Sequence, residues 1–136
     1  MSALLEHTSD VAIQAEGYSL QEVFSSALRQ MDEVLLPGYC GTAEHYDSYL
    51  RIHLRGADPT VLLIDFLSEA LALSYIQKTL FCYVYFEVMG RKELVGNLYG
   101  RWYGKLENEI KAVTFHEAHL HRDPSGKWGT PILFDL

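Results

Sequence analysis

Ionisable side chains are concentrated in the stretch Ile110–His121, whose sequence is IKAVTFHEAHLH. Successive side chains of a strand point to opposite faces of its sheet. Lys111 therefore shares a face with Val113, while His116 lies on the other face. We predict a strand over residues 113–120, with a lysine at its start that holds a positive charge near a fixed partner. The alternative is that Lys111 extends into water and that the histidines lie on a hydrated sheet face.

Carboxylates stand at both ends of the sequence. Asp10 comes just before an alternating apolar segment, Asp135 is the penultimate residue, and Leu136 carries the α-carboxylate. If the first and last strands are neighbours, the three carboxylates converge, and each pair at ~4 Å repels by several kcal/mol in a partly buried site. The cluster therefore requires a positive charge, either Lys111 or a divalent cation. Hard oxygen ligands favour Ca²⁺, Mg²⁺ or Mn²⁺ over zinc.

Three further residues are weaker candidates. His116, at the rim of this cluster, is a further ligand or a residue that orients one. His7 belongs to a polar tetrapeptide, HTSD, that leads into the first predicted strand and is equally consistent with a turn. Asp65 and Glu69 lie four residues apart on one helix face, a spacing that suits metal binding or acid–base chemistry but is more often a solvated stripe.

Hydrophobic periodicity predicts the elements that position these residues. Strands are expected at residues 11–16, 47–54, 80–89, 94–104, 113–120 and 128–134, and helices at residues 19–35 and 58–78. Ser19 with Glu22 forms a capping box for the first helix, and Asp58-Pro59 begins the second. We expect one α+β domain over residues 1–136, a two-layer sandwich in which two main helices pack on one face of a mixed sheet. The glycines at a spacing of four, Gly96, Gly100 and Gly104, predict bulges or close backbone approaches rather than a phosphate loop.

The composition restricts the partners. The 136 residues carry a formal charge of −7, which argues against direct, sequence-independent nucleic-acid binding and favours a protein partner, a metal ion or a cationic ligand. Cys40 and Cys82 form no zinc-type pattern, and we expect two reduced thiols. The sequence opens without a signal peptide, and its apolar stretches are shorter than the roughly 20 residues that span a bilayer. We therefore expect no membrane association and a cytoplasmic location, or a nuclear one in a eukaryote.

Four segments resemble the archease family. They are EHTSDVAI at residues 6–13, GADPTVLLIDFLSEAL at 56–71, IKAVTFHEAHL at 110–120 and WGTPILFDL at 128–136. The order and spacing are those of the family, and the segments extend over the whole chain. The departures are mild: Ser9 and Ala12 replace the usual alanine and glycine, Phe115 replaces tyrosine, and Leu136 stands where isoleucine is common. None removes a carboxylate, although Phe115 lacks the phenolic hydroxyl of the family.

The resemblance implies a non-enzymatic activator of the RtcB-type RNA ligase of tRNA splicing. Such an activator promotes guanylylation of the ligase and allows multiple turnovers, and it meets tRNA only through the ligase. The family binds a divalent metal through positions that correspond to Asp10, Asp135 and the carboxylate of Leu136, and its functional lysine corresponds to Lys111. Calcium is the first expectation for the metal, and magnesium or manganese are alternatives.

Other functions are compatible with the same residues. One is a chaperone or a modulator of tRNA methylation, for which Asp10 and Asp135 are dispensable. A less favoured one is a small metal-dependent hydrolase using Asp10, Asp135 and His116, although motifs such as GxSxG and HExxH are missing from the sequence. The last is a purely structural sheet end in which Lys111 forms an ion pair with Asp10 or Asp135.

Overall fold

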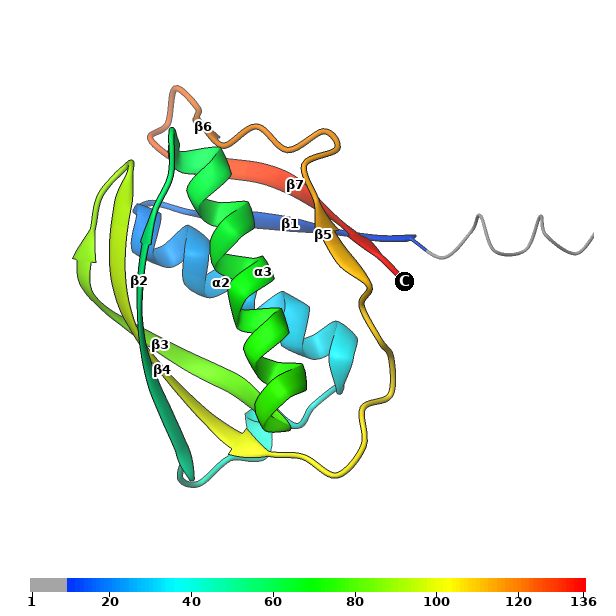
Figure 1. The fold of residues 1–136 in the computed structure, drawn as a ribbon. Helices are drawn as coiled ribbons and strands as arrows, with labels where there is room; N and C mark the ends of the chain where they lie inside the picture. The colour runs from blue at the N-terminus through cyan, green and yellow to red at the C-terminus, as the bar shows by residue number, and fades with distance from the viewer. Residues whose placement is uncertain (1–9) are drawn as a thin grey trace, which may run out of the picture.

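The computed structural model describes residues 10–136, and His7 lies outside them. The elements follow one another along the chain as drawn in Figure 1: β1 (Asp10–Gly17), α2 (Leu20–Leu35), a short 3₁₀ turn (Cys40–Thr42), β2 (Ser48–Arg55), α3 (Pro59–Gln77), β3 (Thr79–Met89), β4 (Glu93–Trp102), β5 (Ala112–Thr114), β6 (His121–Arg122) and β7 (Trp128–Asp135).

The strands of the described residues form two antiparallel sheets. One has the order β1-β7-β5, with β6 also paired to β7, and the other has the order β2-β4-β3. The α+β class with two main helices is confirmed, but the sheets are antiparallel and separate, so the expected single mixed sheet is not what forms. The β-α-β order suggested a shared sheet for β1 and β2, whereas β1 pairs with β7 and β2 pairs with β4.

Both helices begin as their sequences predict. The Ser19 hydroxyl accepts a hydrogen bond from the Glu22 amide at 3.2 Å, and the Glu22 carboxylate accepts one from the Tyr18 amide at 2.8 Å. These bonds satisfy amide groups that have no partner inside the helix. Helix α3 starts in the same way, because Asp58 accepts a bond from the Val61 amide at 2.9 Å. It ends at Lys78, which adopts a left-handed conformation with φ of 52°.

The core lies where the two helices meet the inner faces of both sheets. Phe24 of α2, Phe66 of α3 and Phe86 of β3 form a three-ring cluster with centroid separations of 5.5, 5.7 and 6.1 Å. Contacts from α2 reach β1 and β7 on one side and β3 on the other. The aromatic cluster therefore joins elements that are distant in sequence and fixes one sheet relative to the other.

Helix α3 has the length and apolar composition of a membrane span. This differs from the expectation that every apolar stretch is too short. Its Leu62, Leu63, Phe66 and Leu67 are buried inside the protein, as is typical of a core helix. Absence of membrane association remains a prediction.

The predicted strand over residues 113–120 is mostly wrong. Strand β5 covers only Ala112–Thr114, and Glu117 then takes a left-handed conformation with φ of 63°, which turns the chain. Beyond the turn, the amide of Leu120 donates to Thr60 Oγ1 at 2.9 Å, and the amide of His119 donates to Thr130 Oγ1 at 2.8 Å. Over this segment, side-chain hydroxyls accept the backbone hydrogen bonds that a neighbouring strand would accept in a sheet.

The prediction of two free thiols is also wrong. Cys40, in the turn after α2, and Cys82, on β3, form a disulfide across a sequence separation of 42 residues. Packing of α2 against β3 brings the two residues together, and their Cα atoms lie 5.4 Å apart. The spacing of Cys40 and Cys82 in the sequence does not indicate this contact.

Gly100 is the glycine of the predicted set that most clearly permits a close backbone approach. A Cβ atom there would lie 2.6 Å from the carbonyl oxygen of Leu80 on β3, whereas one at Gly104 would meet nothing within 4 Å. We expect Gly100→Ala to lower the free energy of unfolding by about 1–3 kcal/mol through overpacking. Gly104→Ala is the matched control, with an expected change within ~0.5 kcal/mol. Urea denaturation of both variants measures the difference, and equal stabilities would contradict this account of the β3–β4 contact.

Candidate functional site

The two ends of the described chain meet in one sheet. Strand β7 lies between β1 and β5, and Asp135 is directly opposite Asp10 on one side and Ala112 on the other. Figure 1 shows the carboxyl terminus beside the start of β5 and the start of β1. Asp10 and Asp135 are therefore close together, as expected if the first and last strands are neighbours.

Asp10 and Asp135 point to the same, solvent-facing side of this sheet. Burial alternates along β1 and β7, with Phe134 and Ile132 turned into the core and Asp10 and Asp135 exposed. Directly opposite residues of an antiparallel pair have Cβ atoms roughly 5 Å apart, and like charges there repel. The pair therefore forms a site of concentrated negative charge on the outer face.

The last residue is held by its side chain. Leu136 is half-buried and packs against the core, on the side of the sheet opposite Asp135. This contact fixes the end of the backbone one residue beyond the acidic pair. The α-carboxylate of Leu136 is therefore tied to the same edge of the sheet.

Helix α3 fixes the approach to β5. The Tyr75 hydroxyl donates to the carbonyl of Ile110 at 2.8 Å and accepts from its amide at 2.7 Å. Burial raises the pKa of Tyr75, which keeps this donor protonated. The next amide, that of Lys111, donates to the Asp135 carbonyl at 2.6 Å. These bonds place Lys111 beside Asp135 at the level of the backbone.

The Lys111 side chain does not neutralise the acidic pair. It is exposed and, together with Ser68, Ala72 and Tyr75, lines a shallow hollow of about 320 Å³. Within residues 10–136, no ion pair joins Lys111 to a carboxylate. The alternative of a structural sheet end closed by a lysine–aspartate ion pair therefore receives no support.

Two of the weaker candidates, His116 and Glu69, lie away from the pair. His116 stands in the turn beyond β5, on the far side of Thr114 from Asp135, and its Nε2 lies 3.4 Å from the Glu117 carboxylate. Glu69 is on the exposed side of α3 and forms no ion pair among the described residues. His7 falls outside the described part of the chain.

Comparison with known proteins identifies the family of this chain. The model of the archease protein family matches residues 3–136. The chain belongs to the archease family. The archease of Pyrococcus furiosus is 29% identical over 139 residues, covering 96% of this chain and 95% of the relative. The archease of Methanosarcina mazei is also 29% identical, with coverages of 97% and 93%.

Solved archease-like structures have the same fold. Protein 1598 of Methanobacterium thermoautotrophicum aligns with a TM-score of 0.75 and 27% identity, covering 95% of this chain and 94% of the other. A Thermotoga maritima protein, described as an archease and possible chaperone, aligns with a TM-score of 0.68. At 21% identity, that second likeness supports the fold alone.

A different group of side chains in this archease has the chemistry of metal ligands. Potential ligand atoms of Asp32, Cys40 and Cys82 all lie within 4.8 Å of one another, and this is the one cluster of three or more such residues in the described chain. Its three residues form no metal-binding motif in the sequence. The two sulfurs are bonded to each other in this structure, so they are not available as thiolate ligands.

The β2-β4-β3 sheet and the segment just before β2 expose a surface rich in tyrosine, which we call the tyrosine face: Tyr46, Tyr49, Tyr83, Tyr85 and Tyr99. Tyr46, Tyr49 and Tyr83 each pack against Tyr99, with centroid separations between 5.1 and 6.3 Å. Large aromatic residues exposed together often mark an interaction surface.

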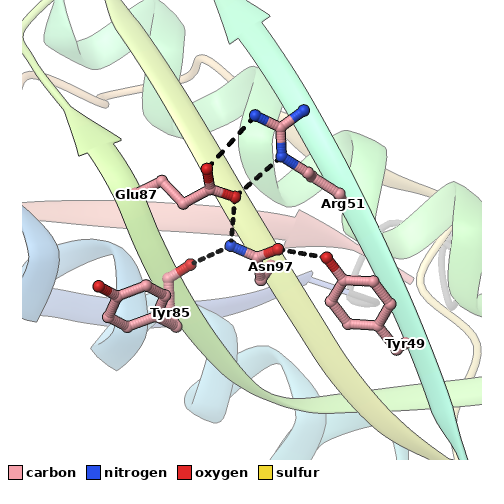
Figure 2. Close-up of polar contacts among 5 residues, drawn as sticks. All are labelled: Tyr49, Arg51, Tyr85, Glu87 and Asn97. Carbon is pink, nitrogen blue, oxygen red and sulfur yellow. Dashed lines mark hydrogen bonds and ion pairs between the residues drawn. The ribbon is translucent and has the colours of Figure 1, made fainter.

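Polar contacts hold the tyrosine face rigid (Figure 2). The Asn97 amide group donates to the Glu87 carboxylate at 2.8 Å and accepts a hydrogen bond from the Tyr49 hydroxyl. Arg51 Nε donates to the same Glu87 oxygen, Oε2, at 2.8 Å, and Arg51 Nη2 donates to Oε1 at 3.4 Å. These bonds lower the pKa of Glu87, with Arg51 making the largest contribution. The network thus ties β2, β3 and β4 together beneath the exposed rings.

The electrostatic effect of the acidic pair can be measured on stability, without an activity assay, by replacing one of its two aspartates. In metal-free buffer we expect Asp135→Asn to raise the melting temperature by on the order of 1–2 °C, because a like-charge repulsion is lost. We expect the wild-type protein to gain stability when Ca²⁺ or Mn²⁺ is added, and the variant to gain much less. Differential scanning calorimetry measures both effects. Equal metal-induced shifts in the two proteins would argue against a cation at this pair.

Proposed function

We propose that this archease activates an RtcB-type RNA ligase by presenting a divalent cation at the outer edge formed by Asp10, Asp135 and the carboxylate of Leu136. The observation that carries the proposal is the register that sets Asp10 opposite Asp135 on one solvent-facing side. Two adjacent carboxylates without an internal cation attract a divalent ion more strongly than either does alone.

The donor set suits a hard cation. Carboxylate oxygens are the ligands that Ca²⁺, Mg²⁺ and Mn²⁺ prefer. The described residues contribute no third histidine, cysteine or acidic side chain to the pair. A bound ion therefore keeps open positions for water or for groups of a partner, as a metal shared with the ligase requires.

Lys111 acts beside the metal rather than as its ligand. Its backbone is fixed against Asp135 by the 2.6 Å hydrogen bond, while its amine is exposed. An amine held there but engaged with no internal carboxylate is available for a phosphate group or an acidic residue of the ligase. A cation bridging phosphate oxygens would offset charge that develops in nucleotidyl transfer.

The overall charge favours this partner over direct RNA binding. A formal charge of −7 suits docking on a basic RNA- and nucleotide-binding cleft, where opposite potentials accelerate association. The same charge repels free RNA at low salt. Contact with tRNA therefore passes through the ligase.

The proposal is tested by guanylylation of a purified RtcB-type ligase at limiting metal. We expect Asp135→Ala to reduce stimulation by on the order of tenfold or more, because a charged ligand is lost. Glu16→Gln is the matched control, since Glu16 lies on the same strand and the same face as Asp10. Full stimulation by Asp135→Ala at limiting metal would rule out the cation role.

The carboxylate of Leu136 gives a second test. Residues appended after Leu136 convert its carboxylate into an amide, which removes one charged ligand. We expect a carboxyl-terminal tag to weaken metal affinity by on the order of tenfold. Isothermal titration with Mn²⁺ measures the affinity, and the same tag at the other end of the chain is the control. An affinity that is unaffected by the terminal tag would remove Leu136 from the ligand set.

A chaperone function is the second candidate, and the tyrosine face is the observation that favours it. Tyr49 and Tyr85 are 55% and 57% exposed, which leaves apolar surface of the kind that binds other proteins. This function predicts that Tyr85→Ser impairs protection of an aggregating client protein while Asp135→Ala does not. The ligase function predicts that Asp135→Ala impairs the stimulation of guanylylation while Tyr85→Ser does not.

A further inference from the structure

Asp32 is a buried carboxyl with an unusual contact. Its residue is 1% exposed on the inner side of α2, and its Oδ1 has no hydrogen-bond partner among the described residues. Its Oδ2 lies 3.6 Å from Cys40 Sγ. A disulfide sulfur has no proton to donate, so the hydrogen at this contact belongs to the carboxyl. A buried polar atom left without a partner calls for an explanation beyond packing.

In the disulfide-bonded protein, the surroundings keep this carboxyl neutral. Burial raises the pKa of Asp32 well above its usual range, and the neighbouring charge of Glu33 raises it further. The inward side chains of β1, β3 and β7, which pack on α2, are uncharged. Arg101 of β4 is engaged with the Tyr39 carbonyl at 2.9 Å and with the Tyr39 ring, and no ion pair joins Asp32 to a basic side chain among the described residues. None of these groups supplies a counter-ion, so a proton fills that role.

The two sulfurs differ in accessibility. Cys40 is half-buried in the 3₁₀ turn Cys40–Thr42, whereas Cys82 is 8% exposed on β3. A small thiol or disulfide in solution therefore reaches Cys40 first. The accessible sulfur is also the one in contact with Asp32.

We propose that Cys40, Cys82 and Asp32 form a thiol–disulfide exchange site whose co-reactant is a low-molecular-weight thiol or disulfide, with Asp32 as the proton carrier of Cys40. This site is separate from the acidic sheet end and does not depend on the ligase function. In a reducing compartment, a disulfide is usually transient or redox-sensing.

Formation of the disulfide proceeds in two exchanges. In the first, the Asp32 carboxylate accepts the Cys40 proton, and the Cys40 thiolate attacks one sulfur of the small disulfide. The sulfur–sulfur bond of that molecule breaks, and one thiolate leaves with the electron pair. In the second, Cys82 gives its proton to solvent and attacks Cys40 Sγ, which releases the other thiolate.

Electrons and protons balance in this scheme. Two electrons pass from the two cysteines to the small disulfide, which is reduced to two thiols. The cysteines lose two protons, one to Asp32 and one to solvent, and the released thiolates take up two from solvent. Reduction follows the same steps in reverse, and Asp32 then returns the proton to Cys40 as that sulfur leaves.

The experiment isolates the first exchange in a Cys82→Ser background, where Cys40 is the one reactive thiol. Reduced protein is mixed with oxidised glutathione, and the adduct on Cys40 is followed by mass spectrometry across a pH series. With Asp32 present, we expect a rate inflection below the usual thiol pKa of ~8.5. Asp32→Asn removes that inflection and slows the reaction at neutral pH on the order of a hundredfold.

Glu33→Gln is the matched control, because Glu33 is an exposed carboxylate one residue away. We expect it to keep the inflection, moved to lower pH because the charge of Glu33 raises the pKa of Asp32. An Asp32→Asn profile identical to that of the parent would overturn the proposal. So would complete alkylation of both cysteines in the unmodified protein after equilibration with oxidised glutathione.

A second measurement covers the case in which Asp32→Asn changes packing. In the oxidised protein, the folded-state pKa of Asp32 is raised above its unfolded value of ~3.9. Its contribution to stability is therefore complete below that value and is lost as the pH rises through the folded-state pKa. We expect the unfolding free energy of oxidised wild type, relative to oxidised Asp32→Asn, to fall as the pH rises. A difference that does not change with pH would mean that Asp32 does not retain its proton beside the disulfide, and it would overturn the proposed role.

Discussion

The pairing of β7 between β1 and β5 is the constraint on which the acidic site depends. β7 is the last strand of the chain and β1 the first described one, so the sheet has to close over the full length of the sequence. The register is fixed because Phe134 and Ile132 fill the core, and a shift by one residue would turn them outward. The same alternation that buries Phe134 exposes Asp135 opposite Asp10. The acidic pair is thus a direct consequence of core packing.

Helix α3 extends this constraint to Lys111. Tyr75 holds both backbone groups of Ile110, and the following amide binds the Asp135 carbonyl. The core helix therefore sets the position of the segment before β5, and β5 in turn sets the edge of the sheet. Two aspartates and a lysine that are distant in sequence are brought together by one helix and three strands, and no ion pair among the described residues joins Lys111 to either aspartate.

The local structure could be predicted from the sequence, and the long-range contacts only in part. Apolar periodicity and the caps at Ser19 and Asp58 gave both helices to within a few residues, because these signals act between near neighbours. The meeting of Asp10 with Asp135 was conditional on a strand pairing that periodicity cannot specify. The same limit explains the two antiparallel sheets in place of one mixed sheet.

The errors have identifiable physical causes. The alternation after Val113 resembled a strand, but the left-handed turn at Glu117 and the hydroxyls of Thr60 and Thr130 satisfy the backbone instead. Cys40 and Cys82 were expected to be free because their spacing fits no motif, and only the packing of α2 on β3 brings them together. The burial of Asp32 could not be predicted from the sequence, because an aspartate on a helix is usually exposed. It becomes evident only once the packing of that helix face is known.

Solvent access determines how each group of carboxylates in this archease is neutralised. Asp10 and Asp135 face water, where ionised carboxylates are well solvated, and in the proposed function their mutual repulsion is relieved by a cation shared between them. Asp32 is enclosed by α2, β3 and the disulfide, where an unpaired charge would lose its hydration without replacement, and a proton neutralises it instead. A cation exchanges with solvent or with a partner protein, whereas a buried proton exchanges with the nearest sulfur. The same side chain therefore suits metal presentation at one end of the fold and thiol chemistry in its interior.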